Sequence, residues 1–459
     1  MKKLTSILIS IAVVLSTFFS LPSSAAYDDA MKELELNSDC ILLMSADNGE
    51  IIFKKNTGKQ TAPASLTKIV TAIVVIENCD DLYQTVTVPE ECIKELSGTG
   101  SSMANLKVGE ILTVYDLLCY LMIMSANDAA TVLANHVSNG DRAAFIAKMN
   151  EVAARLGCTN TNFTNPHGLD DDDQYTTAED LAKIMKHAMS LVDFAEITGR
   201  LSYTVGKTNL RDSRTITNTC YLLNKNFPKY YYKYAKSGKT GTTSEAGRCL
   251  VSYASKDGYN YIAIALGAEE KDFDGDGKTE NGALLDCKAM FRWAFENLEL
   301  VAVSDPKKVV GEVKVNYAKS ADHVSLVPAK TIYSLVPLGT DKGSVLIEPI
   351  PESMPEAVYA PIKKGATVCK GRVLYAGEVL CEIDLVAASD VKRSTSALLL
   401  AKTKSFVKSP LFIIPAVIIL VAVAVLLFFI KKQNKRKARP INGKDYRILG
   451  YNDFINIKK

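Results

Sequence analysis

The feature that most limits how this chain can fold is an uncharged apolar run of twenty residues, Leu411 to Ile430. At 1.5 Å per residue, a helix of that length is about 30 Å long and matches the hydrocarbon core of a bilayer. Five of the next seven residues are Lys or Arg. Because basic residues stay on the cytoplasmic side, the sequence predicts one membrane span, with the body of the chain outside and the basic tail, residues 431–459, inside.

A second apolar segment lies at the N-terminus. Lys2 and Lys3 are followed by residues 4–21, which are apolar apart from scattered Ser and Thr. Polar residues end this run, and Ala25 and Ala26 are small enough for a signal-peptidase site. The sequence therefore predicts a signal peptide over residues 1–26 and an exported mature protein. An uncleaved anchor helix is the alternative.

Charge is divided unevenly between the body and the tail. The formal net charge is +3, yet residues 431–459 hold ten Lys or Arg and two Asp, a local +8. Subtracting this tail and the two N-terminal lysines leaves −7 for residues 27–430. A nucleic-acid-binding protein concentrates basic residues on its folded part, so no nucleic-acid partner is expected.

The cysteines do not follow a disulfide or metal-binding pattern. The chain has ten, and the first eight are scattered among apolar neighbours without a Cys-x-x-Cys pair or metal-ligand spacing. We interpret most of them as buried apolar thiols. Cys369 and Cys381 form the pair that most merits a disulfide test. We expect neither a metal nor a cofactor.

The order of the predicted elements indicates an α+β domain over residues 27–303. The pattern predicts a hairpin turning at residues 47–49, helices near 63–76, 113–124, 129–136, 178–189 and 281–298, and strands at 236–243, 249–255 and 259–267. Residues 304–395 alternate short β-rich runs with Gly/Pro turns, which predicts a small all-β, sandwich-like domain. A stalk is expected over residues 396–410.

Ser65 and Lys68 are the first candidate catalytic pair. They lie at i and i+3, on one face of the predicted helix near residues 63–76. A serine hydroxyl needs a neighbouring base, and a lysine can be that base when burial disfavours its charged form. Three other Ser-x-x-Lys segments occur, but only Ser65 opens an apolar helix that would bury the pair.

Two further motifs add to this pair. Ser125 and Asn127 lie between two predicted apolar helices, where a hydroxyl and an amide can project into a shared cleft. Lys239, Thr240 and Gly241 lie on a predicted strand. The small Gly241 lets a substrate backbone lie against that strand, while the Lys and Thr side chains can meet a carboxylate.

Taken in order, Ser-x-x-Lys, Ser-x-Asn and Lys-Thr-Gly resemble the penicillin-recognising serine enzymes. The flanking residues are similar to those of the serine-type D-alanyl-D-alanine carboxypeptidases, the low-molecular-mass penicillin-binding proteins. The segments that carry this similarity are Gly100–Met103, Leu106–Glu110, Ser125–Ala129, Asn165–Leu169 and Lys239–Thr243. The resemblance implies a serine transpeptidase/β-lactamase-like catalytic domain followed by the all-β domain.

The same resemblance implies an acyl-enzyme mechanism on a peptidoglycan stem peptide that ends in D-Ala-D-Ala, and inhibition by β-lactams. Ser65 would be the nucleophile, Lys68 its base and Ser125 a proton relay. The substrate would be bound by the remaining motif residues, which are Asn127, Lys239, Thr240, Gly241 and Thr242. The backbone N–H groups of Ser65 and Thr242 would form the oxyanion hole.

Some residues depart from the family pattern. Gln174 stands where many relatives have His, an acidic run precedes it at Asp170–Asp173, and Thr242 stands where some relatives have His. His167 is interpreted as structural rather than as a base. The acidic loop beginning at Asp272 imitates a calcium loop, but Ala283 occupies the position of the bidentate Glu, so a solvated insertion is the favoured interpretation.

Three other functions remain open at this point. A β-lactamase is disfavoured because no Glu-x-x-Leu-Asn segment lies between the second and third motifs. A transpeptidase would use the same acyl-enzyme with an amine acceptor. A catalytically weak wall-binding or regulatory protein is the alternative outside the enzymes, and the presence of all the expected catalytic residues argues against it.

Overall fold

The computed structural model describes residues 33–375 and 378–437. The predicted signal peptide and residues 438–459 of the basic tail lie outside the described residues. The chain divides into two compact units, which are described separately. Of the described residues, the first unit contains 33–310, 327–353 and 369–385, and the second contains 311–326, 354–368 and 386–437.

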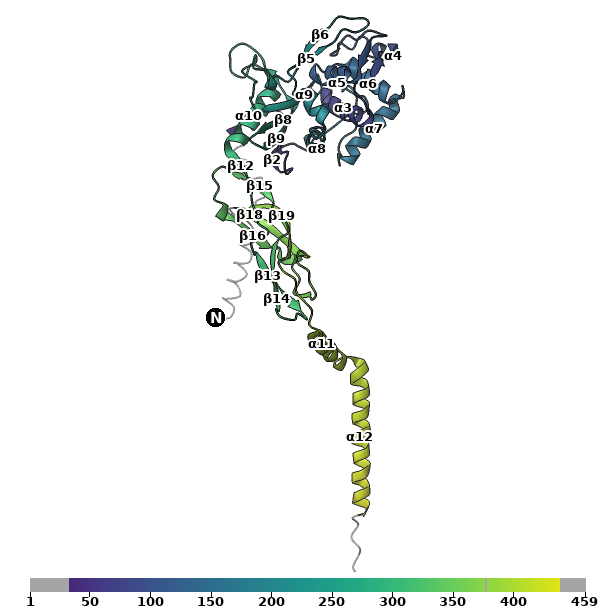
Figure 1. Cartoon of the computed structure of the whole chain (residues 1–459), viewed down its shortest axis with the longest axis vertical. Helices are drawn as coiled ribbons and strands as arrows, with labels where there is room; N and C mark the ends of the chain where they lie inside the picture. Colours follow the sequence, from purple (N-terminus) through teal and green to yellow (C-terminus); the bar gives the residue numbers. More distant parts are fainter. Residues whose placement is uncertain (1–32, 376–377, 438–459) are drawn as a thin grey trace, which may run out of the picture. The chain divides into compact units, whose positions relative to one another are not determined.

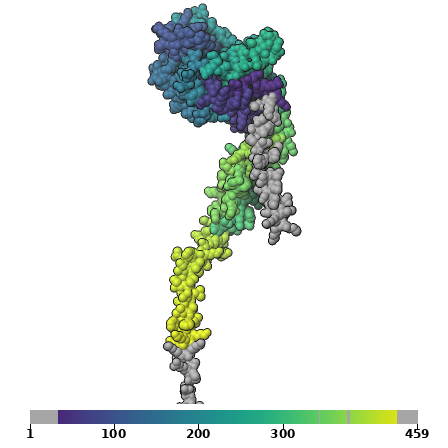
Figure 2. All heavy atoms as spheres, turned by 180° about the vertical axis from the view of Figure 1, so that it is seen from behind, coloured from purple at the N-terminus to yellow at the C-terminus, as the bar shows by residue number. Residues whose placement is uncertain are grey.

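The centre of the first unit is a five-stranded antiparallel sheet in the order β2-β1-β9-β8-β7 (Figure 1). Its strands are β1 (Cys40–Ser45), β2 (Ile51–Lys55), β7 (Ala235–Thr243), β8 (Gly247–Lys256) and β9 (Tyr259–Ala268). The first strands therefore lie beside much later ones, as the purple and teal segments do in both views (Figures 1 and 2). β7 is the last strand of this sheet, so one of its edges is not paired within it.

Each face of the sheet buries a hydrophobic cluster. Alternate residues of β1 point to opposite faces, so Leu42 belongs to one cluster and Leu43 to the other. The helices that contribute to the first cluster are α3 (Thr67–Asn78), α4 (Glu90–Lys94), α5 (Val114–Ile123), α6 (Asn127–Val137), α7 (Arg142–Arg155), α8 (Ala178–Ala188) and α9 (Val192–Gly199). α10 (Gly282–Asn297) contributes Phe291 to the second cluster. This is the predicted α+β catalytic fold.

Several elements were not predicted from the sequence. They are α4, α7, α9 and the paired strands β3 (Thr85–Thr87) with β4 (Ile111–Thr113), β5 (Ser202–Val205) with β6 (Arg214–Thr217), and β10 (Glu270–Lys271) with β11 (Glu280–Asn281). Each of these strands has only two to four residues. Such a strand cannot show the alternation of apolar and polar residues on which a prediction depends.

The region after α10 is all-β, as predicted. Its strands are β12 (Leu298–Ala302), β13 (Gly311–Asn316), β14 (His323–Pro328), β15 (Tyr333–Pro337), β16 (Val345–Pro349), β17 (Val358–Tyr359), β18 (Thr367–Tyr375) and β19 (Glu378–Ala387). Within the first unit β12 pairs with β15, and β16 pairs with β18. Within the second unit β13 pairs with β14 and with β17. The predicted boundary at residue 303 stays a prediction.

All ten cysteines lie in the described part of the chain, and all are free thiols. Eight are buried, which confirms their interpretation as apolar core residues. Burial raises the pKa of the Cys92 thiol to about 11, so the reactive thiolate is scarce at neutral pH. Cys369 and Cys381, the pair singled out for a disulfide test, are free as well.

The second unit ends in two helices, α11 (Thr395–Val407) and α12 (Pro410–Lys437). α11 lies in the segment predicted to be a stalk, so that segment contains a helix. Within the described residues, one helix is long and apolar enough to cross a membrane, and it covers Pro410–Asn434 of α12. Its apolar side chains, for example those of Leu411 and Leu420, are exposed.

Candidate active site

The candidate nucleophile and base lie at the start of α3. A 3-10 turn over Ala64–Leu66 runs directly into this helix, which keeps Ser65 and Lys68 on one face. Lys68 Nζ donates a hydrogen bond to Ser65 Oγ at 2.9 Å. Because Ser65 lies in the first turn, its backbone N–H has no acceptor within the helix and remains available to a ligand.

Lys68 is fully buried, and its environment favours the neutral amine. Burial lowers the pKa of Lys68 well below its usual 10.5, and the nearby charge of Lys239 lowers it further. Lys68 Nζ also donates to the backbone carbonyl of His167 at 2.5 Å, which fixes the amine beside the hydroxyl. A neutral, positioned amine at this place can remove the hydroxyl proton of Ser65.

The second motif lies in the turn between α5 and α6. Ser125 has φ +65°, a left-handed conformation that a residue with a Cβ rarely adopts. Asn127 begins α6, and its backbone N–H donates to the carbonyl of Ser102 at 2.8 Å. The next residue, Asp128, accepts from the backbone N–H groups of Ala104 and Leu106, so the 102–106 segment is held against this turn.

Lys239 connects the sheet to this turn. Its Nζ donates to Ser125 Oγ at 2.8 Å and to the Thr240 carbonyl at 2.6 Å. The side chain is buried, and burial lowers the pKa of Lys239 to about 7. The site thus contains two lysine–serine pairs, one between Lys68 and Ser65 and one between Lys239 and Ser125.

We expect the free energy of unfolding to depend on pH through the titration of Lys239. Between pH 7 and 10.5 this lysine binds fewer protons in the folded than in the unfolded state, so it makes the free energy of unfolding rise with pH. Lys239→Met removes this titration. Denaturant unfolding of both proteins should be measured from pH 6 to 9. Above about pH 7, the free energy of unfolding of the wild type should rise relative to that of the variant. A difference independent of pH would contradict the buried, neutralised lysine.

Gly241 brings β7 against the nucleophile. A Cβ added at Gly241 would lie 3.2 Å from Ser65 N and 3.2 Å from Ala64 Cβ, which is tighter than an ordinary contact. Thr240 Oγ1 lies 2.7 Å from Thr219 Oγ1, and Thr242 follows on the same face of the strand. All eight residues predicted for the site therefore lie around the start of α3, the α5–α6 turn and β7.

With this geometry established, the chain can be compared with known proteins. Residues 27–270 match the Peptidase_S11 family, D-alanyl-D-alanine carboxypeptidase, over more than half of the chain. The chain belongs to this family. Residues 298–393 match the C-terminal domain of penicillin-binding protein 5.

Individual relatives agree with this assignment. The chain is 30% identical over 405 residues to D-alanyl-D-alanine carboxypeptidase DacF of Bacillus subtilis, covering 88% of this chain and 98% of the relative. It is 29% identical to DacC of Escherichia coli, covering 76% and 83%. Penicillin-binding protein 5 from Haemophilus influenzae has a similar structure, with a TM-score of 0.64 and 26% identity over 78% of this chain and 98% of that protein.

The loop over residues 165–174 contributes to the site of this family member in a way that was not predicted. Gly168 has φ +86°, and a Cβ there would meet the Ala64 carbonyl oxygen at 1.8 Å. The Asn165 carboxamide accepts from the Gly168 N–H at 2.7 Å. The buried His167 ring accepts from Leu169 N through Nδ1 at 3.2 Å, which is a structural role for its side chain. The chemically important atom of His167 is its carbonyl, which a search for side-chain motifs cannot find.

Gln174, noted as a departure from the family pattern, also fixes this loop. Its carboxamide oxygen accepts from the backbone N–H groups of Thr164 and Asn165, and its Nε2 donates to the Leu169 carbonyl. A neutral carboxamide can do both at once because it carries a donor and an acceptor. Asp170, the first residue of the acidic run, accepts from Thr243 Oγ1 at 2.7 Å.

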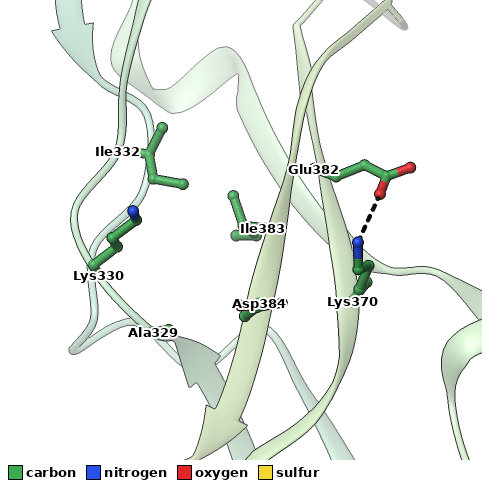
Figure 3. A pocket seen from close by; sticks show the side chains of 7 residues that line it. All are labelled: Ala329, Lys330, Ile332, Lys370, Glu382, Ile383 and Asp384. Atoms are coloured by element: carbon green, nitrogen blue, oxygen red, sulfur yellow. Dashed lines mark ion pairs between the residues drawn. The ribbon is translucent and has the colours of Figure 1, made fainter. Parts of the chain in front are cut away.

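Two other polar clusters lie away from these residues. A pocket of about 470 Å³ in the β region is lined by Lys330, Lys370, Glu382 and Asp384, with an ion pair between Lys370 and Glu382 (Figure 3). It presents no nucleophile beside a base. In the loop after β10, the exposed Asp272, Asp274 and Asp276 lie near the buried Glu280. Lys229 forms ion pairs with Asp274 and Glu280, and the three aspartates are solvent-exposed.

Proposed function

We propose that this chain is a membrane-anchored serine D-alanyl-D-alanine carboxypeptidase that removes the terminal D-Ala from peptidoglycan stem pentapeptides and so limits cross-linking. Membership of the Peptidase_S11 family establishes the enzyme class. The observation that supports the residue roles is the 2.9 Å contact between Ser65 Oγ and the buried Lys68 Nζ.

In the acylation step, the neutral amine of Lys68 removes the proton of Ser65 as Oγ attacks the carbonyl carbon of the penultimate D-Ala. The backbone N–H groups of Ser65 and Thr242 stabilise the negative charge that develops on the carbonyl oxygen. Both groups suit this role: Ser65 N lies in a first helical turn, and Gly241, beside Thr242, packs against it.

Collapse of the tetrahedral intermediate breaks the peptide bond and leaves an ester on Ser65. The departing D-Ala amine needs a proton, and the contact of Lys239 Nζ with Ser125 Oγ provides a route for one. Water then attacks the ester and releases the shortened peptide. An enzyme of this type reacts covalently with β-lactams at the same serine.

Substrate binding follows from β7 and α6. The unpaired edge of β7 allows an extended peptide to lie beside the strand. In this proposal Asn127 binds the substrate amide, Lys239, Thr240 and Thr242 bind the terminal carboxylate, and Gly241 leaves room for the peptide backbone. No metal or cofactor takes part in these steps.

The proposed location of the enzyme is based on its C-terminal helix. We propose that residues 411–430 span the cell membrane, that residues 431–459 lie in the cytoplasm, and that the catalytic domain, residues 27–303, acts outside after removal of residues 1–26. The support is the apolar helix at Pro410–Asn434 and the basic residues that follow it. Residues 304–395 and 396–410 are the proposed β-sandwich-like domain and stalk.

The test uses the full-length protein in detergent with a stem pentapeptide ending in D-Ala-D-Ala. Free D-alanine and cross-linked product are quantified, and a fluorescent penicillin reports acylation. We expect the wild type to release D-alanine without cross-links and to be labelled, and Ser65→Ala to do neither. Release that survives Ser65→Ala would refute the assigned nucleophile. A folded wild type that neither releases D-alanine nor is labelled would support the regulatory alternative, and cross-links as main product would support a transpeptidase.

A further inference from the structure

The acylation step places a positive charge on a buried amine. When Ser65 Oγ bonds to the substrate carbonyl carbon, its O–H bond breaks and the proton passes to Lys68 Nζ, which becomes an ammonium group. The Lys68 side chain is fully buried, and a second buried lysine, Lys239, lies nearby. A buried cation costs free energy unless hydrogen bonds and a negative charge compensate for it. The site therefore needs a negative charge close to Lys68.

Asp128 supplies a negative charge at this place. It lies in the first turn of α6, directly after Asn127, and its side chain is completely buried. α6 packs against α3, the helix that carries Lys68. Burial and the charge of Lys239 lower the pKa of Lys68, whereas the charge of Asp128 raises it. Asp128 thus opposes the two influences that would make Lys68 a weak base.

Backbone N–H groups hold the carboxylate of Asp128 in place. Oδ1 accepts from Ala104 N at 2.9 Å and from Ala129 N at 3.0 Å. Oδ2 accepts from Leu106 N at 3.0 Å. Both oxygens act only as acceptors, which is the hydrogen-bonding pattern of an ionised carboxylate. All three donors are neutral, so they fix the carboxylate without neutralising its charge, and that charge remains available to act on Lys68.

Other titratable groups around Lys68 do not supply such a charge. Lys239, on β7, is either a cation or a neutral amine. His167 directs its carbonyl to Lys68 Nζ, and burial lowers the pKa of its ring, which keeps the ring neutral near pH 7. Behind this ring, Glu95 Oε1 lies 3.8 Å from His167 Nε2, and the Glu95 carboxylate is paired with Arg142. An acidic group without a cationic partner of its own is therefore contributed by α6.

We infer that Asp128 is a positioning residue whose buried negative charge acts through Lys68 and stabilises the proton that this amine takes from Ser65. The charge keeps the amine basic enough to remove the proton, while burial keeps it neutral in the resting enzyme. This inference rests on the proposed function, because it concerns the base of the same acyl transfer. It gives an electrostatic role to a residue that follows the second motif and is not part of it.

The test measures the pH dependence of penicillin labelling with the full-length protein in detergent. Asp128→Asn removes the charge and keeps the shape, whereas Asp128→Glu keeps the charge and changes the shape. Asp286→Asn is the matched control. Asp286 is also buried and accepts from the backbone N–H groups of Asn37 and Ser38, but it lies on α10, which packs on the other face of the sheet. Asp128→Ser, whose hydroxyl can still accept an N–H, is used if Asp128→Asn fails to fold.

The wild-type labelling rate should rise with pH as Lys68 loses its proton. Without the charge of Asp128 the amine loses its proton more readily, so the midpoint for Asp128→Asn should move to lower pH. Its rate above the midpoint should fall roughly 3- to 30-fold, because a weaker base removes the hydroxyl proton less readily. Asp128→Glu and Asp286→Asn should keep the wild-type midpoint. The other titratable groups around the amine are the same in every variant, so a difference between the profiles is due to the carboxylate.

A merely structural role of Asp128 would lower the labelling rate in Asp128→Asn and leave the midpoint where it is in the wild type. That result would overturn the inference while the proposed function stands, and so would a variant whose rate and midpoint are both unchanged. A midpoint that moved equally in Asp128→Glu would show that shape, not charge, is responsible. A wild type that neither reacts with penicillin nor releases D-alanine would refute the proposed function, and the inference with it.

Discussion

Lys68→Arg is expected to reduce acylation of Ser65 by roughly 10²- to 10⁴-fold, the usual contribution of a positioned general base. The substitution keeps most of the side-chain length and a hydrogen-bond donor. An arginine, however, cannot lose its proton in a protein, whereas the burial of Lys68 lowers its pKa and makes the neutral amine accessible. The rate of covalent labelling by a fluorescent penicillin is the measurement.

The pH dependence of labelling gives a second observation on the same residue. In the wild type the rate should rise with pH as the Lys68 amine loses its proton, with a midpoint well below 10.5. Lys68→Arg should remove that rise. Lys94→Arg is a matched control, because Lys94 is an exposed lysine paired with Glu90, and it should label at the wild-type rate. Wild-type labelling by Lys68→Arg would refute Lys68 as the base.

Gly168→Ala is expected to cost roughly 2–4 kcal/mol of stability and to impair acylation as well. The alanine Cβ would lie 1.8 Å from the Ala64 carbonyl oxygen, an impossible contact with backbone, and φ is +86°. The loop must therefore move away from the start of α3. That movement also removes the neighbouring His167 carbonyl from Lys68 Nζ. Denaturant unfolding and penicillin labelling of the full-length protein test the two effects.

Gly140→Ala separates the backbone effect from the clash. Gly140 has nearly the same φ, +88°, but the nearest atom to its added Cβ lies at 3.8 Å. We expect this control to cost about 1 kcal/mol and to label normally. If Gly168→Ala proved no worse than Gly140→Ala in both measurements, the close packing of the loop against Ala64 would not be required for the site.

The sequence alone was sufficient to predict the positions of site residues whose motif is local. Ser65 and Lys68 meet because a helix places i and i+3 together, and Lys239 lies on a strand whose residues were predicted to be extended. The turn that carries Ser125 was expected from the change of helix at that point. Short-range geometry and residue type are enough to predict such positions.

The remaining contacts depend on packing between distant segments. Lys239 reaches Ser125 across 114 residues, and the His167 carbonyl reaches Lys68 across 99. Nothing local marks a backbone carbonyl as functional, and Gly168 resembles any turn glycine until the Ala64 carbonyl is placed against it.

The burial of two lysines in one site has a consequence for how this enzyme can change. Each lysine opposes folding because water would solvate its charge better than the protein does. Replacing either lysine by an apolar residue of similar size should raise the free energy of unfolding and abolish catalysis. Selection for heat resistance alone would therefore favour inactive descendants. Variants that are more stable and still active must instead carry their stabilising substitutions at residues remote from Lys68 and Lys239.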